Sequence, residues 1–157
     1  MAGGKVHADG LDFTLPAGLA GVEDNALARG QVVPLSGLAS HVGLLMTATY
    51  APASGLTGTV TITYTDKTTA SSPVTVPDWA SSTVPQKAVV AAHGDRVNGS
   101  GRAQSTRVAN LCSVAVDVDP HRRPASDTLP TGPRYMGAKS PALHVFALAT
   151  DGPDSAS

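Results

Sequence analysis

The segment from Gly58 to Asp66 most constrains what this chain can fold into, because its residues alternate between two kinds. Val60, Ile62 and Tyr64 fall on one side of a two-residue period, and threonines occupy the positions between and beside them. Side chains of a strand point alternately to opposite faces, so the pattern predicts a strand with one apolar and one polar face. Antiparallel sheets that are covered on one side have this alternation.

The composition favours many short strands over helices. The chain has 157 residues, which suits one domain with a substantial core, and 41% of them are hydrophobic. It contains 16 threonines but only one glutamate, Glu23, and threonine favours strands whereas glutamate favours helices. With 16 glycines and 12 prolines, turns must be frequent. This composition is therefore typical of β-sandwiches and β-barrels.

Eight or nine segments have the pattern of strands, and no internal repeat or linker separates them. The continuous apolar run at 42–50 is typical of a central strand, and Pro34 places 31–35 at an edge or a strand end. The polar, glycine-rich stretch 93–107 is expected to be an exposed loop. The expected strands are 11–15, 31–35, 42–50, 57–66, 71–76, 87–92, 108–118, 125–129 and 143–148.

Charge and cysteine usage exclude several classes of function. The net charge is −1 and no basic stripe with interleaved aromatic residues is present, so nucleic acid is not an expected partner. No apolar run is long enough to span a membrane, and no signal peptide follows Met1 in the chain as given. The single cysteine, Cys112, excludes an intramolecular disulfide, and its place in an alternating apolar run predicts a buried thiol.

The motifs that usually carry catalysis or metal binding are weak. The five histidines are scattered without a short ligand spacing, and no cofactor is expected. Calcium binding is an alternative at two places. Asp117 and Asp119 could instead form a solvated strand end, and Asp24 and Asn25 could instead cap a loop. No pair of carboxylates for acid–base catalysis and no nucleophile elbow is indicated.

Several segments, in order and spacing, resemble the galactose-binding-like, jelly-roll β-sandwich accessory domains of bacterial glycosidases. They cover most of the chain, and each one by itself is a generic turn or strand pattern. The segments are Asp9–Pro16, Asp24-Asn25, Gly30-Gln31, Val42-Gly43, Ala48-Thr49, Gly58–Thr61, Tyr64–Asp66, Asp78-Trp79, Arg96–Asn98, Asp119-Pro120, Leu129-Pro130 and His144–Leu148.

The chain departs from that family pattern in two places. The family opens with a segment and strand ahead of the part that matches Asp9–Pro16, and this opening is absent here. The stretch 120–130 is also less regular than the family pattern. A missing strand leaves a sheet edge that a second copy or a partner domain would fill, which predicts possible homo-oligomers.

The resemblance implies a single antiparallel, jelly-roll-like β-sandwich domain over residues 1–157, with an ordered core of about 9–150 and a frayed tail at 151–157. It implies a non-catalytic carbohydrate-binding or accessory module, a catalytic domain as partner, and an exported parent protein. Aromatic and planar polar groups suit sugar recognition, so the candidate ligand-binding residues are Trp79, Asp78, Arg96 and Asn98.

Two other functions stay open at this point. The first is a purely structural domain that packs on a catalytic neighbour through an apolar surface and binds no free sugar. The second is a small stand-alone β-barrel enzyme of the cyclase or isomerase type, with a deep pocket and His41 or His93 as acid–base groups. Fold alone does not separate them, because sandwiches host many functions.

Overall fold

The computed structural model describes residues 4–17, 23–85, 87–97, 103–133, 137 and 139–152, with the strand segments 92–97 and 103–108 described by their backbone alone. Within these ranges the regular structure consists of strands and contains no helix. The strands are β1 Lys5–Ala8, β2 Leu11–Thr14, β3 Ala26–Leu27, β4 Val32–Pro34, β5 His41–Thr49, β6 Leu56–Tyr64, β7 Thr69–Val76, β8 Ala88–Val97, β9 Ala103–Asp117, β10 Pro124–Thr128 and β11 Ala142–Thr150.

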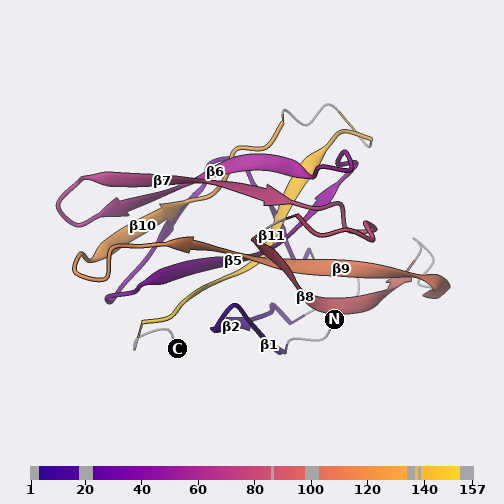
Figure 1. The fold of residues 1–157 in the computed structure, drawn as a ribbon, viewed down its shortest axis with the longest axis horizontal. Coiled ribbons are helices and arrows are strands. Elements are labelled where there is room, and N and C mark those ends of the chain that lie inside the picture. Colours follow the sequence, from indigo (N-terminus) through magenta and orange to yellow (C-terminus); the bar gives the residue numbers. More distant parts are fainter. Residues whose placement is uncertain are drawn as a thin grey trace.

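Two antiparallel sheets pack face to face (Figure 1). One has the strand order β4-β10-β6-β7 and the other the order β3-β11-β5-β9-β8. The main hydrophobic core lies between them and draws residues from both sheets, among them Val60 and Ile62 of β6 and Val42, Leu44 and Met46 of β5. The prediction of an all-β, antiparallel β-sandwich is therefore confirmed.

The alternating strand behaves as its pattern predicts. In β6, Val60, Ile62 and Tyr64 are buried in the core, and the threonines face outward. The outward hydroxyl groups pair across the sheet with β7, where Thr61 Oγ1 lies 2.9 Å from Ser71 Oγ. Side-chain pairs of this kind add to the stability of the ladder. The apolar and polar faces of β6 are thus both used, one for packing and the other for cross-strand hydrogen bonds.

Strand β5 is central, as its continuous apolar run predicts, because the sheet is covered on both faces. Residues 42–48 are all buried. Val42, Leu44 and Met46 face the core between the sheets, whereas Leu45 belongs to a second cluster on the outer face. A strand that is buried on both faces has no reason to alternate between apolar and polar residues.

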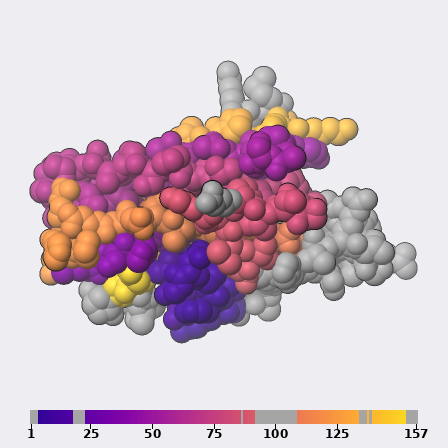
Figure 2. All heavy atoms as spheres, viewed as in Figure 1, coloured from indigo at the N-terminus to yellow at the C-terminus, as the bar shows by residue number. Residues whose placement is uncertain are grey.

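The covering layer on the outer face is the hairpin β1–β2, indigo in Figures 1 and 2. The pair Asp9-Gly10 connects the strands, with φ values of 52° and 73° that fit a two-residue type I′ turn. Leu11 and Phe13 of β2 are buried against the five-stranded sheet, and Gly43 makes room for them. A Cβ atom at Gly43 would lie 2.8 Å from Phe13 Cζ.

The sequence prediction missed part of this architecture. It placed the first strand at 11–15 and contained no strand at β1, although Asp9-Gly10 is a strong hairpin signal. The predicted exposed loop 93–107 is wrong, because β8 continues to Val97 and β9 begins at Ala103. Pairing of β8 with the long strand β9 satisfies the backbone there and overrides the weak strand propensity of the sequence.

The edge position of the proline-containing strand, the hairpin that follows the alternating strand and the burial of Cys112 are confirmed. Strand β4, which contains Pro34, is an edge strand of its sheet, and β6 and β7 form a hairpin. Cys112 is fully buried, and burial raises the pKa of its thiol to about 11. The described part of the chain contains no helix long and apolar enough to cross a membrane.

Candidate functional site

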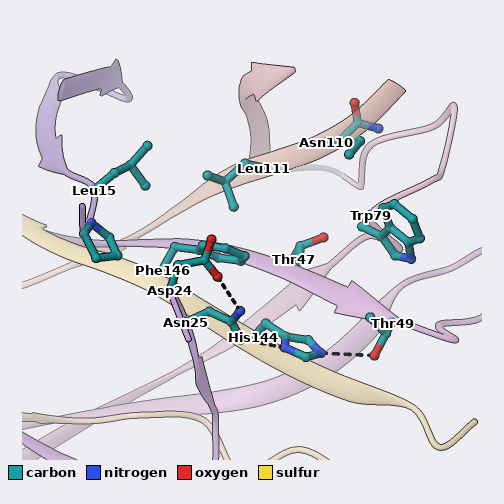
Figure 3. A pocket seen from close by; sticks show the side chains of 12 residues that line it. Leu15, Asp24, Asn25, Thr47, Thr49, Trp79, Asn110, Leu111, His144 and Phe146 are labelled. Carbon is teal, nitrogen blue, oxygen red and sulfur yellow. Dashed lines mark hydrogen bonds between the residues drawn. The ribbon is translucent and has the colours of Figure 1, made fainter. Parts of the chain in front are cut away.

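A pocket of about 510 Å³ opens on the outer face of the five-stranded sheet, beside the end of the β1–β2 hairpin (Figure 3). The hairpin covers one part of that face and leaves the neighbouring part open. Strands β5, β9 and β11 form the floor, and three connecting segments form the walls. The lining residues are Leu15, Pro16, Asp24, Asn25, Thr47, Thr49, Trp79, Ala109, Asn110, Leu111, His144 and Phe146.

A β-bulge in β11 shapes the floor. Val145 pairs with Met46 of β5 and Ala147 pairs with Leu45, so that Phe146 is an extra residue between two consecutive pairs. The inserted residue shifts the alternation of the strand by one position. As a result, Phe146 joins His144 in the pocket, while Ala147 packs under the hairpin.

Four pocket residues form a continuous chain of hydrogen bonds. Asn25 Nδ2 donates to Asp24 Oδ1 at 2.9 Å, and Asn25 Oδ1 lies 2.9 Å from His144 Nδ1. His144 Nε2 lies 3.1 Å from Thr49 Oγ1. The chain joins the segment before β3 to strands β11 and β5, as the dashed lines in Figure 3 show in part. It fixes the orientation of every side chain in it.

Burial governs the charge state of the central imidazole. His144 is partly buried, and loss of solvent lowers its pKa. The ring is therefore neutral at neutral pH, with one nitrogen that carries hydrogen and one that accepts. Such a group orients neighbouring polar groups and is also able to take up a proton.

Thr47 supplies a polar group on the pocket floor. The residue is 8% exposed, and Oγ1 has no hydrogen-bond partner in the described part of the chain. A buried hydroxyl without a partner costs roughly 1–3 kcal/mol. In Figure 3 it lies between Leu111 and Trp79. A ligand in the pocket would remove that cost by bonding to it.

Trp79, a predicted ligand-binding residue, lines the pocket and is partly buried. Backbone hydrogen bonds hold it between two strands: its N–H donates to Ala48 O at 2.8 Å, and its carbonyl accepts from Asn110 N at 2.7 Å. The indole is thus attached to the rigid sheet although it belongs to the connection between β7 and β8. In Figure 3 it stands at the opposite end of the pocket from Leu15.

Asp78, the second predicted residue, does not line the pocket. Its Oδ2 accepts from Ala51 N at 3.1 Å and its Oδ1 accepts from Ala80 N at 3.0 Å. Both oxygens therefore bind backbone groups, and the side chain fastens the turn that presents Trp79.

The two remaining predicted residues are not placed at the pocket. Arg96 lies in β8, where its backbone pairs with Gln104, and its side chain is not described. Asn98 lies outside the described residues. The polar residues that the structure does bring together are Asp24, Asn25 and His144, with threonines of β5. The sequence contained them as separate signals, and only the fold shows that they converge.

The alternatives for metal and acid–base chemistry lie elsewhere. Among the described residues, no group of three or more His, Cys, Asp or Glu side chains is arranged to hold a metal ion. Asp117 is 96% exposed and lies 3.6 Å from His41 Nε2, and Asp119 Oδ1 accepts from His121 N. His41 also contacts Asp151 at 2.7 Å. The side chain of His93 is not described.

Comparisons with known proteins assign no family. No protein-family model matches the chain, and a search of curated proteins finds no significant similarity.

Proposed function

We propose that this domain binds carbohydrate in the pocket on the outer face of the five-stranded sheet. The observation that carries the proposal is the convergence of two aromatic side chains, Trp79 and Phe146, with a set of oriented polar groups. One of these groups is the hydroxyl of Thr47, which has no hydrogen-bond partner within the described ranges. Aromatic faces stack on the apolar faces of sugar rings, and fixed polar groups bond the hydroxyl groups. The volume also lies in the range of roughly 300–1,000 Å³ that is typical of small-ligand sites.

The resemblance to glycosidase accessory domains points to the same pocket. Five of the segments that carry it contribute lining residues: Asp9–Pro16, Asp24-Asn25, Ala48-Thr49, Asp78-Trp79 and His144–Leu148. These segments are far apart in the sequence, so a common location is unexpected if each is only a generic turn or strand. We infer a jelly-roll-like accessory module of an exported bacterial glycosidase, with a catalytic domain as its partner.

The affinity is expected to be weak, on the order of 10 μM to 1 mM, because one or two aromatic contacts and a few hydrogen bonds must offset the entropy of association. Calorimetric titration with a broad panel of monosaccharides and disaccharides tests the proposal. Binding that is lost in Trp79→Ala and in Phe146→Ala, with an unchanged circular dichroism spectrum, supports it. Tyr50→Ala is the control, because Tyr50 is 55% exposed and does not line the pocket.

Other outcomes would favour the rival roles. If no sugar binds and a catalytic domain protects the pocket residues from solvent, the domain is a structural one. Self-association through a sheet edge would show as dimers in sedimentation. In the described chain, β3 pairs with only His144 and Val145 of β11, so most of that edge is not paired by β3.

A second candidate function is acyl transfer by a threonine hydroxyl. The arrangement Thr49, His144 and Asn25 places a hydroxyl, a neutral imidazole and an orienting amide in sequence, at 3.1 Å and 2.9 Å. This is the order of nucleophile, base and orienting group in covalent catalysis. Incubation with a fluorophosphonate followed by peptide mass spectrometry tests it, and an unmodified Thr49 counts against catalysis.

A further inference from the structure

We propose that the pocket selects uncharged ligands whose hydroxyl groups donate hydrogen bonds, and that it rejects uronic acids and sulfated or phosphorylated sugars. This inference rests on the proposed carbohydrate binding and specifies its class. It follows from the direction of the hydrogen bonds between Asp24 and Thr49, which leaves the members of that hydrogen-bond chain with acceptors facing the ligand. The hydroxyl of Thr47 can donate or accept, and it carries no charge.

The donor-to-acceptor direction of this series of hydrogen bonds is set at Asp24. An ionised carboxylate only accepts hydrogen bonds, so the amide of Asn25 must turn its Nδ2 toward Asp24 Oδ1. The carbonyl Oδ1 of Asn25 then faces His144 Nδ1, 2.9 Å away. Because a carbonyl oxygen cannot donate, His144 Nδ1 must carry the hydrogen.

The same direction continues to Thr49. In a neutral imidazole with hydrogen on Nδ1, the other nitrogen has a lone pair and accepts. His144 Nε2 therefore accepts the hydroxyl hydrogen of Thr49, 3.1 Å away. Thr49 has then spent its only donor, and its oxygen offers a ligand nothing but lone pairs.

Asp24 supplies a second acceptor and the charge. Its Oδ1 is bonded to Asn25, whereas Oδ2 has no hydrogen-bond partner in the described part of the chain. Asp24 and His144 are the titratable groups among the lining residues, and neither Lys nor Arg lines the pocket in the described ranges. A neutral imidazole leaves the carboxylate of Asp24 as the local charge. An anionic ligand would meet repulsion and no cationic partner.

The tautomer of His144 tests the direction of these hydrogen bonds, and this test needs no ligand. Two-bond ¹H–¹⁵N correlation spectra of the protein at pH 7.5 distinguish the two neutral tautomers and the imidazolium ion. We expect hydrogen on Nδ1 and an unprotonated Nε2. Hydrogen on Nε2, or an imidazolium ring, would reverse the polarity at Thr49 and overturn the inference.

Matched sugar pairs test the selectivity. The probes are the methyl pyranosides of glucose, galactose and mannose, each against its uronic acid counterpart. The neutral member of any pair that binds should bind at least about tenfold more tightly, the effect of one unscreened like charge in a partly buried site. Deoxyfluoro derivatives of the best neutral sugar should lose binding at the contacted hydroxyl group, because fluorine does not donate.

Asp24→Asn removes the charge and the group that fixes Asn25, so the preference for the neutral sugar should shrink at least severalfold. Asp12→Asn is the matched control: Asp12 pairs with His7 at 2.8 Å on the exposed hairpin, and its loss should leave the preference unchanged. Uronic acids that bind as tightly as neutral sugars overturn this inference alone. Failure of every sugar to bind overturns the proposed function, and the tautomer then decides separately whether the acceptor polarity stands.

Discussion

Asp127 allows a quantitative prediction about stability, because it is a carboxyl group in the core. It lies in β10 between Val33 of β4 and Ile62 of β6, and it is fully buried. Neither carboxyl oxygen has a hydrogen-bond partner in the described part of the chain. Burial disfavours the charged form and raises the pKa of Asp127 from 3.8 to about 6.

The sign of the effect follows from proton uptake. Between pH 4 and pH 6 the unfolded chain loses the proton of Asp127 while the folded protein keeps it, so stability falls as pH rises. The difference between the folded and unfolded pKa values, about 6 and 3.8, corresponds to about 3 kcal/mol. This loss is complete above the folded pKa and absent below the unfolded pKa.

The variant Asp127→Asn isolates this group, since an amide of the same shape does not titrate. Urea denaturation of both proteins at pH 4, 5, 6 and 7.5 gives their difference in unfolding free energy at each pH. We expect the stability of Asp127→Asn relative to the wild type to rise by about 2.5 kcal/mol between pH 4 and pH 7.5, because about 0.5 kcal/mol of the difference is already present at pH 4. A difference that does not change with pH would refute the reasoning.

The other groups with shifted pKa values do not produce the same pH dependence in the difference between the two proteins. The lowered pKa of His144 removes stability as pH falls below 6.5, but it acts in both proteins and cancels in the difference. The pKa of Asp66 is lowered to about 2 by Thr68 and Arg122, and the pKa of Asp151 is also lowered. Their stabilisation is lost only as pH falls below about 3.8. Asp117→Asn, at an exposed position, is the control.

Three further predictions concern packing. Cys112→Ser should cost on the order of 1 kcal/mol or more through a buried hydroxyl, and rapid labelling of the native thiol would contradict its burial. Gly43→Ala should cost about 1–3 kcal/mol by overpacking against Phe13, and an unchanged melting temperature would show that the hairpin yields freely. Tyr64→Phe should cost about 1 kcal/mol, because Asp119 N donates to its hydroxyl at 3.1 Å, and equal denaturation midpoints would exclude this contribution.

Local patterns were sufficient to predict the sandwich because most strands carry their own signal. The alternation in β6 and the continuous apolar run of β5 reflect burial on one face and on both faces. The stretch 93–107 carries no such signal, since its pairing depends on a partner strand. The polar composition of that stretch favoured a loop, whereas the ladder between β8 and β9 decides the structure.

The candidate site was harder to predict because its geometry depends on contacts between distant segments. The chemistry of Trp79 predicts a ligand contact, and Trp79 lines the pocket, whereas Asp78 beside it bonds backbone groups. His144 and Asn25 are 119 residues apart, and nothing local to either indicates the other. The bulge that directs Phe146 into the pocket is likewise a property of strand pairing.

The position of β11 in its sheet has a consequence for the order of folding. The last strand in sequence lies directly beside the central strand β5, and together they form part of the surface that receives the β1–β2 hairpin. During synthesis the hairpin leaves the ribosome before β11, so its docking surface is incomplete until β11 has been made. Leu11 and Phe13 therefore lack their full native packing during that interval, when apolar segments are open to aggregation and to chaperones.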